Sequence, residues 1–257
     1  MTDIGILYKQ KVFSLEYVAE MLSISRPAAS KAMLRWQERG IVRQIRKNMY
    51  TAIDLATGSP VADRFEVASR ISAISFVGWH SALEFHGLAH QQFFDMYVGS
   101  ESRFTHFEFE GVSFAYCASS LLGEDSGVCS AQGNPHVRVT DLERTLVDCI
   151  DHIDRAGGPE ELMHCMEGVL RVDEERMAHY LRLYDKDFLY QKAGYMLDRI
   201  KGQAAITDDL ISLCHSRGTR YAKRLTNGPD SNRYVSEWKL YVPDFMTTVD
   251  IDDHDLI

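Results

Sequence analysis

Three observations predict an α+β fold for this chain. Apolar residues recur at helical spacing in two short segments near the N-terminus, and they alternate with polar residues just after these segments. Aromatic and β-branched residues are frequent over residues 60–139, and helical periodicity returns over residues 140–225. The order predicts a small helix-and-hairpin domain, followed by a mixed α/β domain with a small antiparallel sheet and a helical C-terminal half.

Length and loop signals divide the chain into two domains. Its 257 residues suit one large domain or two ordinary ones. The stretch "DLATGSPVAD" (54–63) contains the Gly, Pro and Ser that are typical of a connection. We therefore predict a first domain over residues 1–56 and a second over residues 60–257, which is sheet-rich at 60–139, helical at 140–225 and closed by strands at 226–245.

Composition excludes several classes of protein. No apolar run is long enough to cross a membrane, so we expect no membrane partner. The five cysteines are scattered and form no CxxC pair, which indicates reduced thiols rather than a disulfide framework. We therefore expect a cytoplasmic protein.

Charge is divided unevenly along the chain. Residues 1–54 hold nine Lys/Arg and five Asp/Glu, so their net charge is +4. The other residues hold 19 basic and 32 acidic side chains, so their net charge is −13, and the total is −9. We name residues 1–54 the basic head. Its positive charge suits a polyanionic partner, which the acidic remainder of the chain would repel.

Two helices are predicted in the basic head. Ser14 and Ser25 are suitable N-caps, Pro27 is tolerated in the first turn of the second helix, and Gly40 is a natural terminator. Helical spacing gives each helix one apolar face, formed by Leu15, Val18, Ala19 and Leu22 in the first helix and by Ala29, Met33 and Trp36 in the second.

A basic hairpin follows the second helix. Residues 41–45 and 49–53 alternate between apolar and polar side chains, and Arg46, Lys47 and Asn48 lie at the tip between them. Helix, turn, helix and basic hairpin, in this order, are typical of a winged helix-turn-helix domain. A solvated basic helix without a ligand is the alternative.

Duplex DNA is the ligand that this arrangement fits. A helix enters the major groove, where Arg and Lys reach guanine edges, while hydroxyl groups and hairpin cations contact phosphates. Dimeric helix-turn-helix proteins read two-fold sites, so we expect an operator with inverted repeats. The predicted DNA-binding residues are Ser25, Arg26, Ser30, Lys31, Arg35, Arg43, Arg46, Lys47 and Asn48.

Three histidines lie close together in the sequence and could in principle bind a metal. His86 and His90 have i, i+4 spacing near His80, but Gly87 separates them and no HExxH pattern is present. Cap or core histidines are therefore expected rather than metal ligands.

The segment "TDLERTLVDCIDHIDRAGG" predicts a helix that begins with a capping box of Thr140 and Glu143 and ends at residues 157–158. We interpret its Asp148, Asp151 and His152 as a solvated acidic face, and its arginines Arg144 and Arg155 as surface ion pairs. No catalytic residue, metal or cofactor is predicted.

Four segments of the chain are distinctive: "WHSALEFHGLAHQ" (Trp79–Gln91), "VTDLERTLVDCIDHIDRAGG" (Val139–Gly158), "KAGYMLDRI" (Lys192–Ile200) and the stretch Tyr221–Val242. Together they resemble the AbiEi family. The resemblance implies an antitoxin and autorepressor of a bacterial toxin–antitoxin operon that acts in abortive infection. It also implies a nucleotidyltransferase-like toxin as the functional partner, countered without a stable complex, and no enzymatic activity.

Two other functions stay open on sequence grounds. The first is a winged-helix regulator whose acidic C-terminal domain senses a ligand or protein and has no antitoxin role. The second is a metal-dependent nuclease or nucleotidyl-transfer enzyme that uses the carboxylates between Asp148 and Asp154. A nucleotidyltransferase-like gene next to this one favours the antitoxin.

Overall fold

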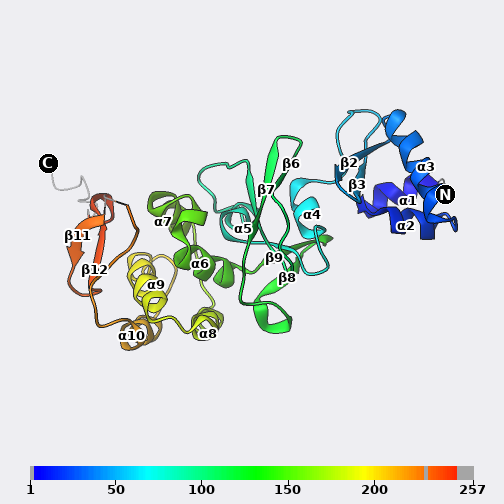
Figure 1. The fold of residues 1–257 in the computed structure, drawn as a ribbon. Helices are drawn as coiled ribbons and strands as arrows, with labels where there is room; N and C mark the ends of the chain where they lie inside the picture. Colours follow the sequence, from blue (N-terminus) through cyan, green and yellow to red (C-terminus); the bar gives the residue numbers. More distant parts are fainter. Residues whose placement is uncertain (1–2, 229–230, 248–257) are drawn as a thin grey trace. The chain divides into compact units, whose positions relative to one another are not determined.

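Figure 1 shows the computed structural model, which describes residues 3–228 and 231–247. These residues form a mixed α+β fold with ten α-helices and three sheets. The chain forms two compact units, Met1–Val77 with Phe93–Leu122 and Val128–Val139, and Gly78–Gln92 with Gly123–Gly127 and Thr140–Ile257. The predicted domain boundary near residues 57–59 falls inside the first unit. The last residues of the predicted second domain, 248–257, lie outside the described residues.

The start of the first unit is a group of three helices beside a three-stranded antiparallel sheet (Figure 1). A short turn joins the second and third helices, and a hairpin follows the third. Leu7, on the first helix, is fully buried, although that helix has no clear cap signal in the sequence. The elements are α1 (Asp3–Gln10), β1 (Val12–Phe13), α2 (Leu15–Met21), α3 (Arg26–Glu38), β2 (Val42–Arg46) and β3 (Met49–Ala52).

The predicted caps of α2 and α3 are confirmed. The Ser14 hydroxyl accepts the Tyr17 N–H at 3.2 Å, and the Ser25 hydroxyl accepts the Ala28 N–H at 3.4 Å. Gly40 follows α3 with φ of +68°, the left-handed conformation that glycine adopts without strain. The predicted apolar faces are also confirmed, because one core cluster contains Val18, Ala29 and Met33, with Leu15, Ala19, Leu22 and Trp36 packed against it.

The rest of the first unit is built on a six-stranded sheet. Its strand order is β6-β7-β5-β4-β9-β8, and the pairs β5–β7 and β4–β9 are parallel. The elements are α4 (Arg64–Ser69), β4 (Phe76–Val77), β5 (Asp95–Gly99), β6 (Phe107–Phe109), β7 (Val112–Cys117), β8 (Val128–Ala131) and β9 (Asn134–Thr140).

This mixed sheet corrects the prediction of a small antiparallel one. Glu110 and Gly111 form the turn between β6 and β7, and both have positive φ, +50° and +74°. That hairpin places β6 at the edge of the sheet, and the other side of β7 pairs with β5 in the parallel direction. The segment 124–136 contains β8 and the start of β9.

Glu66, at the start of α4, joins distant segments of the first unit. Its carboxylate accepts hydrogen bonds from the Lys11 ammonium, from the Asn134 amide at 2.7 Å and from the Asp63 N–H at 3.0 Å. The Asp63 carboxylate in turn accepts the Glu66 N–H, which completes a capping box. Burial opposes ionisation of Glu66, but these hydrogen bonds prevail and lower its pKa.

We expect Glu66→Gln to lower the free energy of unfolding by about 1–3 kcal/mol at neutral pH. Because folding lowers the pKa of Glu66, its contribution is present above the unfolded value near 4.5 and is lost as pH falls below it. Urea denaturation across this range should therefore show the variant and the wild type converging at acid pH. Glu108→Gln, at an exposed position, is the matched control, and curves that stay parallel would contradict the assignment.

The second unit is mostly helical. Its helices are α5 (Trp79–Phe85), α6 (Leu142–Asp151), α7 (Pro159–Glu167), α8 (Glu174–Tyr184), α9 (Asp187–Arg199) and α10 (Asp208–Arg217). A three-stranded sheet follows, β10 (Lys223–Arg224), β11 (Ser231–Val235) and β12 (Leu240–Pro243), in the order β10-β12-β11.

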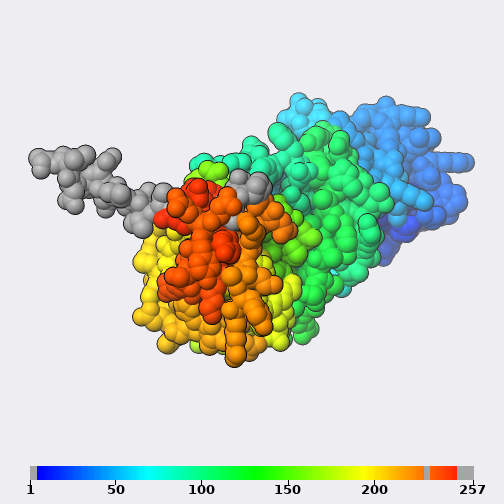
Figure 2. All heavy atoms as spheres, turned by 60° about the vertical axis from the view of Figure 1, so that its left-hand side comes forward, coloured from blue at the N-terminus to red at the C-terminus, as the bar shows by residue number. Residues whose placement is uncertain are grey.

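The small C-terminal sheet covers α9 and α10, as Figure 2 shows in orange and red over yellow. The Gln191 side chain donates to the Trp238 carbonyl at 2.7 Å. Gly194 lets the Trp238 ring approach the helix, because a Cβ at this position would lie 2.1 Å from the ring.

The start and the acidic face of α6 differ from the prediction. Asp141 is the N-cap and accepts the Arg144 N–H at 2.9 Å, whereas Thr140 stays in β9 and bonds to the Thr145 hydroxyl. Asp148 is 1% exposed and is paired at 2.8 Å with Arg144, which is fully buried. The predictions of a Thr140 capping box, a solvated Asp148 and a surface Arg144 are therefore wrong.

The end of α6 is also earlier than predicted. The helix ends at Asp151, and the 3₁₀ turn Ile153–Ala156 carries the chain to Gly157. Asp151 is half-buried and receives the Lys186 ammonium at 2.6 Å. Arg155 is half-buried, with its guanidinium 5.1 Å from the centre of the Trp79 ring, so it is not a simple surface ion pair.

Candidate nucleic-acid interface

The outer face of α3 is the most open part of the predicted DNA-binding set. Ser30, Lys31 and Arg35 are exposed, and Ala29 and Met33 on the opposite face are buried in the core. The Arg35 Nε donates to the Lys31 carbonyl at 3.3 Å, which leaves most of its guanidinium available. Among the described residues, the Ser30 and Lys31 side chains have no hydrogen-bond or ion-pair partner. We name these three residues the α3 face. The helix that carries them is held in the core, and their side chains are accessible from solvent.

Leu34 adds an apolar side chain to this face and was not predicted there. It lies between Lys31 and Arg35 in α3 and is 58% exposed. An apolar contact with a thymine methyl group is one way in which a recognition helix reads a base. Its exposure depends on the helix packing, which the period of the sequence alone does not fix at this position.

Arg26 and Asn48 take part in an interaction inside the protein. The Glu16 carboxylate accepts from the Asn48 amide at 2.7 Å and from the Arg26 Nε at 3.1 Å. The Asn48 carbonyl oxygen also accepts the Leu15 N–H, at 3.1 Å. The hydrogen bonds that Glu16 accepts from Asn48 and from its own backbone lower its pKa to about 2, with smaller contributions from Ser14 and Arg26. Glu16 thus joins the hairpin tip to the starts of α2 and α3, a role that the sequence spacing does not reveal.

Arg43 and Arg46 are directed at the six-stranded sheet of the same unit. Arg43 forms an ion pair with Glu110 in the turn between β6 and β7. The Arg46 guanidinium lies 5.1 Å from the centre of the Phe107 ring and 5.7 Å from that of Phe104. Such cation–π contacts hold a cation in place. Lys47 is exposed and takes part in neither of these contacts, so it is the predicted hairpin cation most accessible from solvent.

A hollow beside the hairpin tip is lined by the hairpin cations and by one further arginine. It has a volume of about 370 Å³, and its lining includes Arg46, Lys47, Asn48 and Arg70. Arg70 follows α4 and lies 2.8 Å from the His136 Nδ1. It comes after the predicted boundary, so the sequence gives no reason to place it here. Three cations around one hollow suit a phosphate group.

We expect Lys47→Ala to weaken binding to every duplex to a similar degree. A lysine that contacts phosphate releases one counterion, so its loss should reduce the slope of log K against log salt by about one. Titrations of labelled duplexes at several salt concentrations measure this slope. Lys9→Ala, on α1, is a control for net charge, and equal slopes for the two variants would exclude a contact by Lys47.

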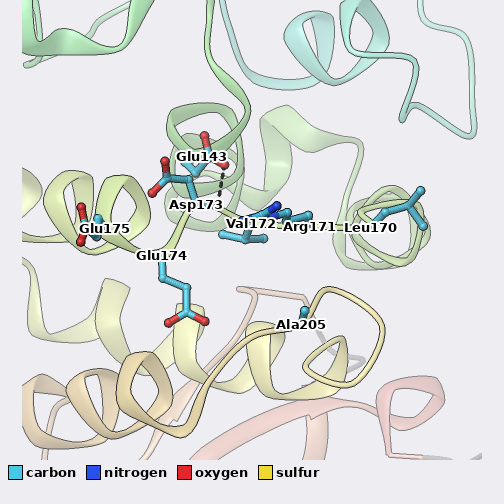
Figure 3. Close-up of a pocket in the computed structure, with 8 residues that line it drawn as sticks. All are labelled: Glu143, Leu170, Arg171, Val172, Asp173, Glu174, Glu175 and Ala205. Atoms are coloured by element: carbon cyan, nitrogen blue, oxygen red, sulfur yellow. Dashed lines mark hydrogen bonds between the residues drawn. The ribbon is translucent and has the colours of Figure 1, made fainter.

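The second unit contains an acidic pocket, shown in Figure 3. Its volume is about 840 Å³, and four carboxylate side chains surround it against one arginine. Leu170 is 82% exposed at one side. A pocket of this charge repels a phosphate backbone and suits a cationic or amphipathic ligand. Its lining consists of Glu143, Leu170, Arg171, Val172, Asp173, Glu174, Glu175 and Ala205.

The other candidate groups, the three histidines and the carboxylates of α6, lie in different surroundings. His86 Nε2 lies 2.8 Å from the Thr140 carbonyl, so it does not join His90 in an i, i+4 pair of ligands. His80 is instead buried against Glu161, 81 residues later in the chain. In the carboxylate group, Asp148 is paired with the buried Arg144, which occupies the carboxylate that a metal site would need.

Comparisons with known proteins define the class of the fold. No family model matches the chain, and no curated protein matches it. The fold is a mixed α+β architecture that a solved protein shares. It is similar to the crystal structure of the Rv2827c protein from Mycobacterium tuberculosis, with a TM-score of 0.66 at 15% sequence identity, over 92% of this chain and 88% of that one. At this identity the likeness concerns the fold alone. No helix in the described part of the chain is long and apolar enough to cross a membrane.

Proposed function

We propose that this protein is a sequence-specific DNA-binding regulator and that its first residues form a winged helix-turn-helix. The observation that carries this proposal is the α3 face, which presents a hydroxyl and two cations from a helix anchored in the core. In this function α3 enters the major groove of an operator, and Lys47 contacts the phosphates beside it. The net charge of +4 over residues 1–54 supports a polyanionic partner.

The acidic remainder of the chain supports a division of labour. Its net charge of −13 disfavours DNA contact away from the basic head. Because segments 79–91, 139–158 and 192–200 resemble AbiEi proteins, we propose that the protein represses its own operon and acts as an antitoxin. Its partner is then a nucleotidyltransferase-like toxin, countered without a stable complex, and the protein itself performs no catalysis.

A titration with two duplexes tests the DNA-binding proposal. One duplex carries the sequence upstream of the protein's own gene, and the other carries the same bases in scrambled order. We expect the full chain to prefer the first by about 10³-fold or more at physiological salt. Equal affinity for both duplexes would leave only non-specific charge attraction and contradict sequence-specific regulation.

Co-expression tests the antitoxin proposal separately. The neighbouring gene is induced with and without the full-length protein, and growth is measured. Rescue of growth by the full chain, and by a Lys31→Ala variant with weakened operator binding, supports an antitoxin role that is independent of repression. A toxic neighbour whose effect is unchanged would contradict that role.

The acidic pocket favours a second function, a regulator that senses a ligand or protein. Its carboxylates and the exposed Leu170 suit a cationic amphipathic ligand. The neighbouring gene distinguishes the two functions, since an antitoxin requires a toxin gene beside its own. The Glu174→Lys variant also distinguishes them: in a ligand sensor it should change the ligand-dependent release of operator DNA and leave DNA binding without ligand unchanged.

A further inference from the structure

We propose that the second unit binds a zinc ion through His80, Glu161 and Cys165. His80 belongs to α5, and the other two residues lie one helical turn apart on α7. All three are buried, with exposed fractions of 0%, 1% and 0%. Their ligand atoms lie within 4.8 Å of one another. The structure thus gathers a nitrogen, an oxygen and a sulfur donor from positions up to 85 residues apart, 80 to 165.

The distances within this cluster suit a tetrahedral ion. His80 Nε2 and Cys165 Sγ lie 3.1 Å and 3.3 Å from the same oxygen, Glu161 Oε1. Zinc bonds of about 2.0–2.3 Å place neighbouring ligands roughly 3.3–3.8 Å apart, so small side-chain rotations would admit the ion. Imidazole, carboxylate and thiolate are all zinc ligands, whereas calcium and magnesium select oxygen alone.

The Glu161 carboxylate is oriented but not fully satisfied. Its Oε1 also accepts the backbone N–H groups of His90 and Gln91 at 3.0 Å and 2.9 Å. Its Oε2 is buried and accepts no hydrogen bond among the described residues. A buried carboxylate oxygen without a partner is costly, and a metal ion removes that cost. The two N–H groups then act as the outer shell that fixes a ligand in place.

Two more histidines supply an entry path and a fourth ligand. His90 Nδ1 lies 4.0 Å from Glu161 Oε2, and the His90 side chain is 65% exposed. The His164 ring lies 4.9 Å from that of His90. An ion can therefore arrive from solvent at His90, which completes four ligands. With four protein ligands the ion is structural and ties α5, residues 86–92 and α7 together.

Metal analysis of the full-length protein tests this proposal. Protein purified without chelator should contain equimolar zinc by mass spectrometry. Cys165→Ser and His80→Ala should retain at most about a tenth of it, since each removes a direct ligand. Cys214→Ser, a buried thiol on α10, should retain all of it. Equal zinc content in Cys165→Ser and Cys214→Ser would overturn the assignment.

Cobalt substitution gives a readout that does not depend on the folding of a variant. Wild-type protein reconstituted with Co²⁺ should show thiolate-to-cobalt charge-transfer absorption, and Cys129→Ser, which removes the exposed thiol, should keep it. Absence of this band in the wild type, together with failure to retain added Zn²⁺ against a colorimetric chelator, would show that the cluster is only hydrogen-bonded and overturn the proposal.

Discussion

Replacing Arg144 with methionine is expected to lower the free energy of unfolding by about 3–5 kcal/mol. The guanidinium is fully buried and donates hydrogen bonds to Asp148 and to the Ser126 carbonyl, and it lies 5.5 Å from the centre of the Tyr184 ring in a cation–π contact. Methionine fills much of the same volume but leaves the Asp148 carboxylate in an apolar interior without its counter-charge. The loss is therefore much larger than for an exposed ion pair.

The protonation of Asp148, the partner of Arg144, provides a stricter test of this prediction. Burial raises the pKa of Asp148, and Arg144 is the charge that opposes this rise. In the Arg144→Met variant the folded state should bind a proton at Asp148 more tightly than the unfolded state does, so the defect should shrink as pH falls. The double variant Arg144→Met, Asp148→Leu should recover most of the stability, because an apolar pair replaces the ion pair.

Urea denaturation at several pH values measures both effects. Arg182→Met, at an exposed position on α8, is the matched control and should change stability by no more than about 0.5 kcal/mol. If Arg144→Met is no worse than this control, the ion pair is not a structural element. If the double variant is as unstable as the single one, the loss comes from packing and not from the unpaired charge.

Local signals made the basic head predictable. Ser14, Ser25 and Gly40 act through hydrogen bonds and φ values confined to one turn, so their roles can be read from neighbouring residues. The same applies to Glu110 and Gly111. At Thr140 the local rule was ambiguous, since Asp141 is an equally good cap one residue later, and β9 extends through Thr140.

Tertiary contacts account for what the sequence did not predict. Asp148 and Arg144, one turn apart on α6, look solvated on a helical wheel, but both are buried, and Tyr184, 36 residues later, donates its hydroxyl to Asp148. The parallel pairing of β5 with β7 depends on where the β6 hairpin folds. The approach of His80 to Glu161 across 81 residues is of the same kind. Periodicity in one segment carries no information about partners that lie far along the chain.

Some residues of the predicted DNA-binding set are exposed and free of partners in the described part of the chain, and others are engaged by distant parts of the protein. This difference predicts a large effect on operator affinity. We expect Lys31→Ala and Arg35→Ala each to weaken specific operator binding by about 1–3 kcal/mol, roughly 5- to 150-fold. Both side chains are exposed cations on a helix whose far face is fixed by Met33. The helix backbone therefore needs no reordering when these side chains meet base edges, and their loss removes contacts that the rest of the surface does not replace.

Arg43→Ala is the internal control for this experiment, because it removes the same charge from the same domain. Its guanidinium is engaged by Glu110 and the Gly58 carbonyl, so its removal should change operator affinity far less than that of Arg35. Anisotropy titrations at one salt concentration compare the three variants. A larger loss for Arg43→Ala than for Lys31→Ala and Arg35→Ala would move the interface from α3 to the sheet side of the hairpin. In that case the Arg43–Glu110 ion pair must open when DNA binds.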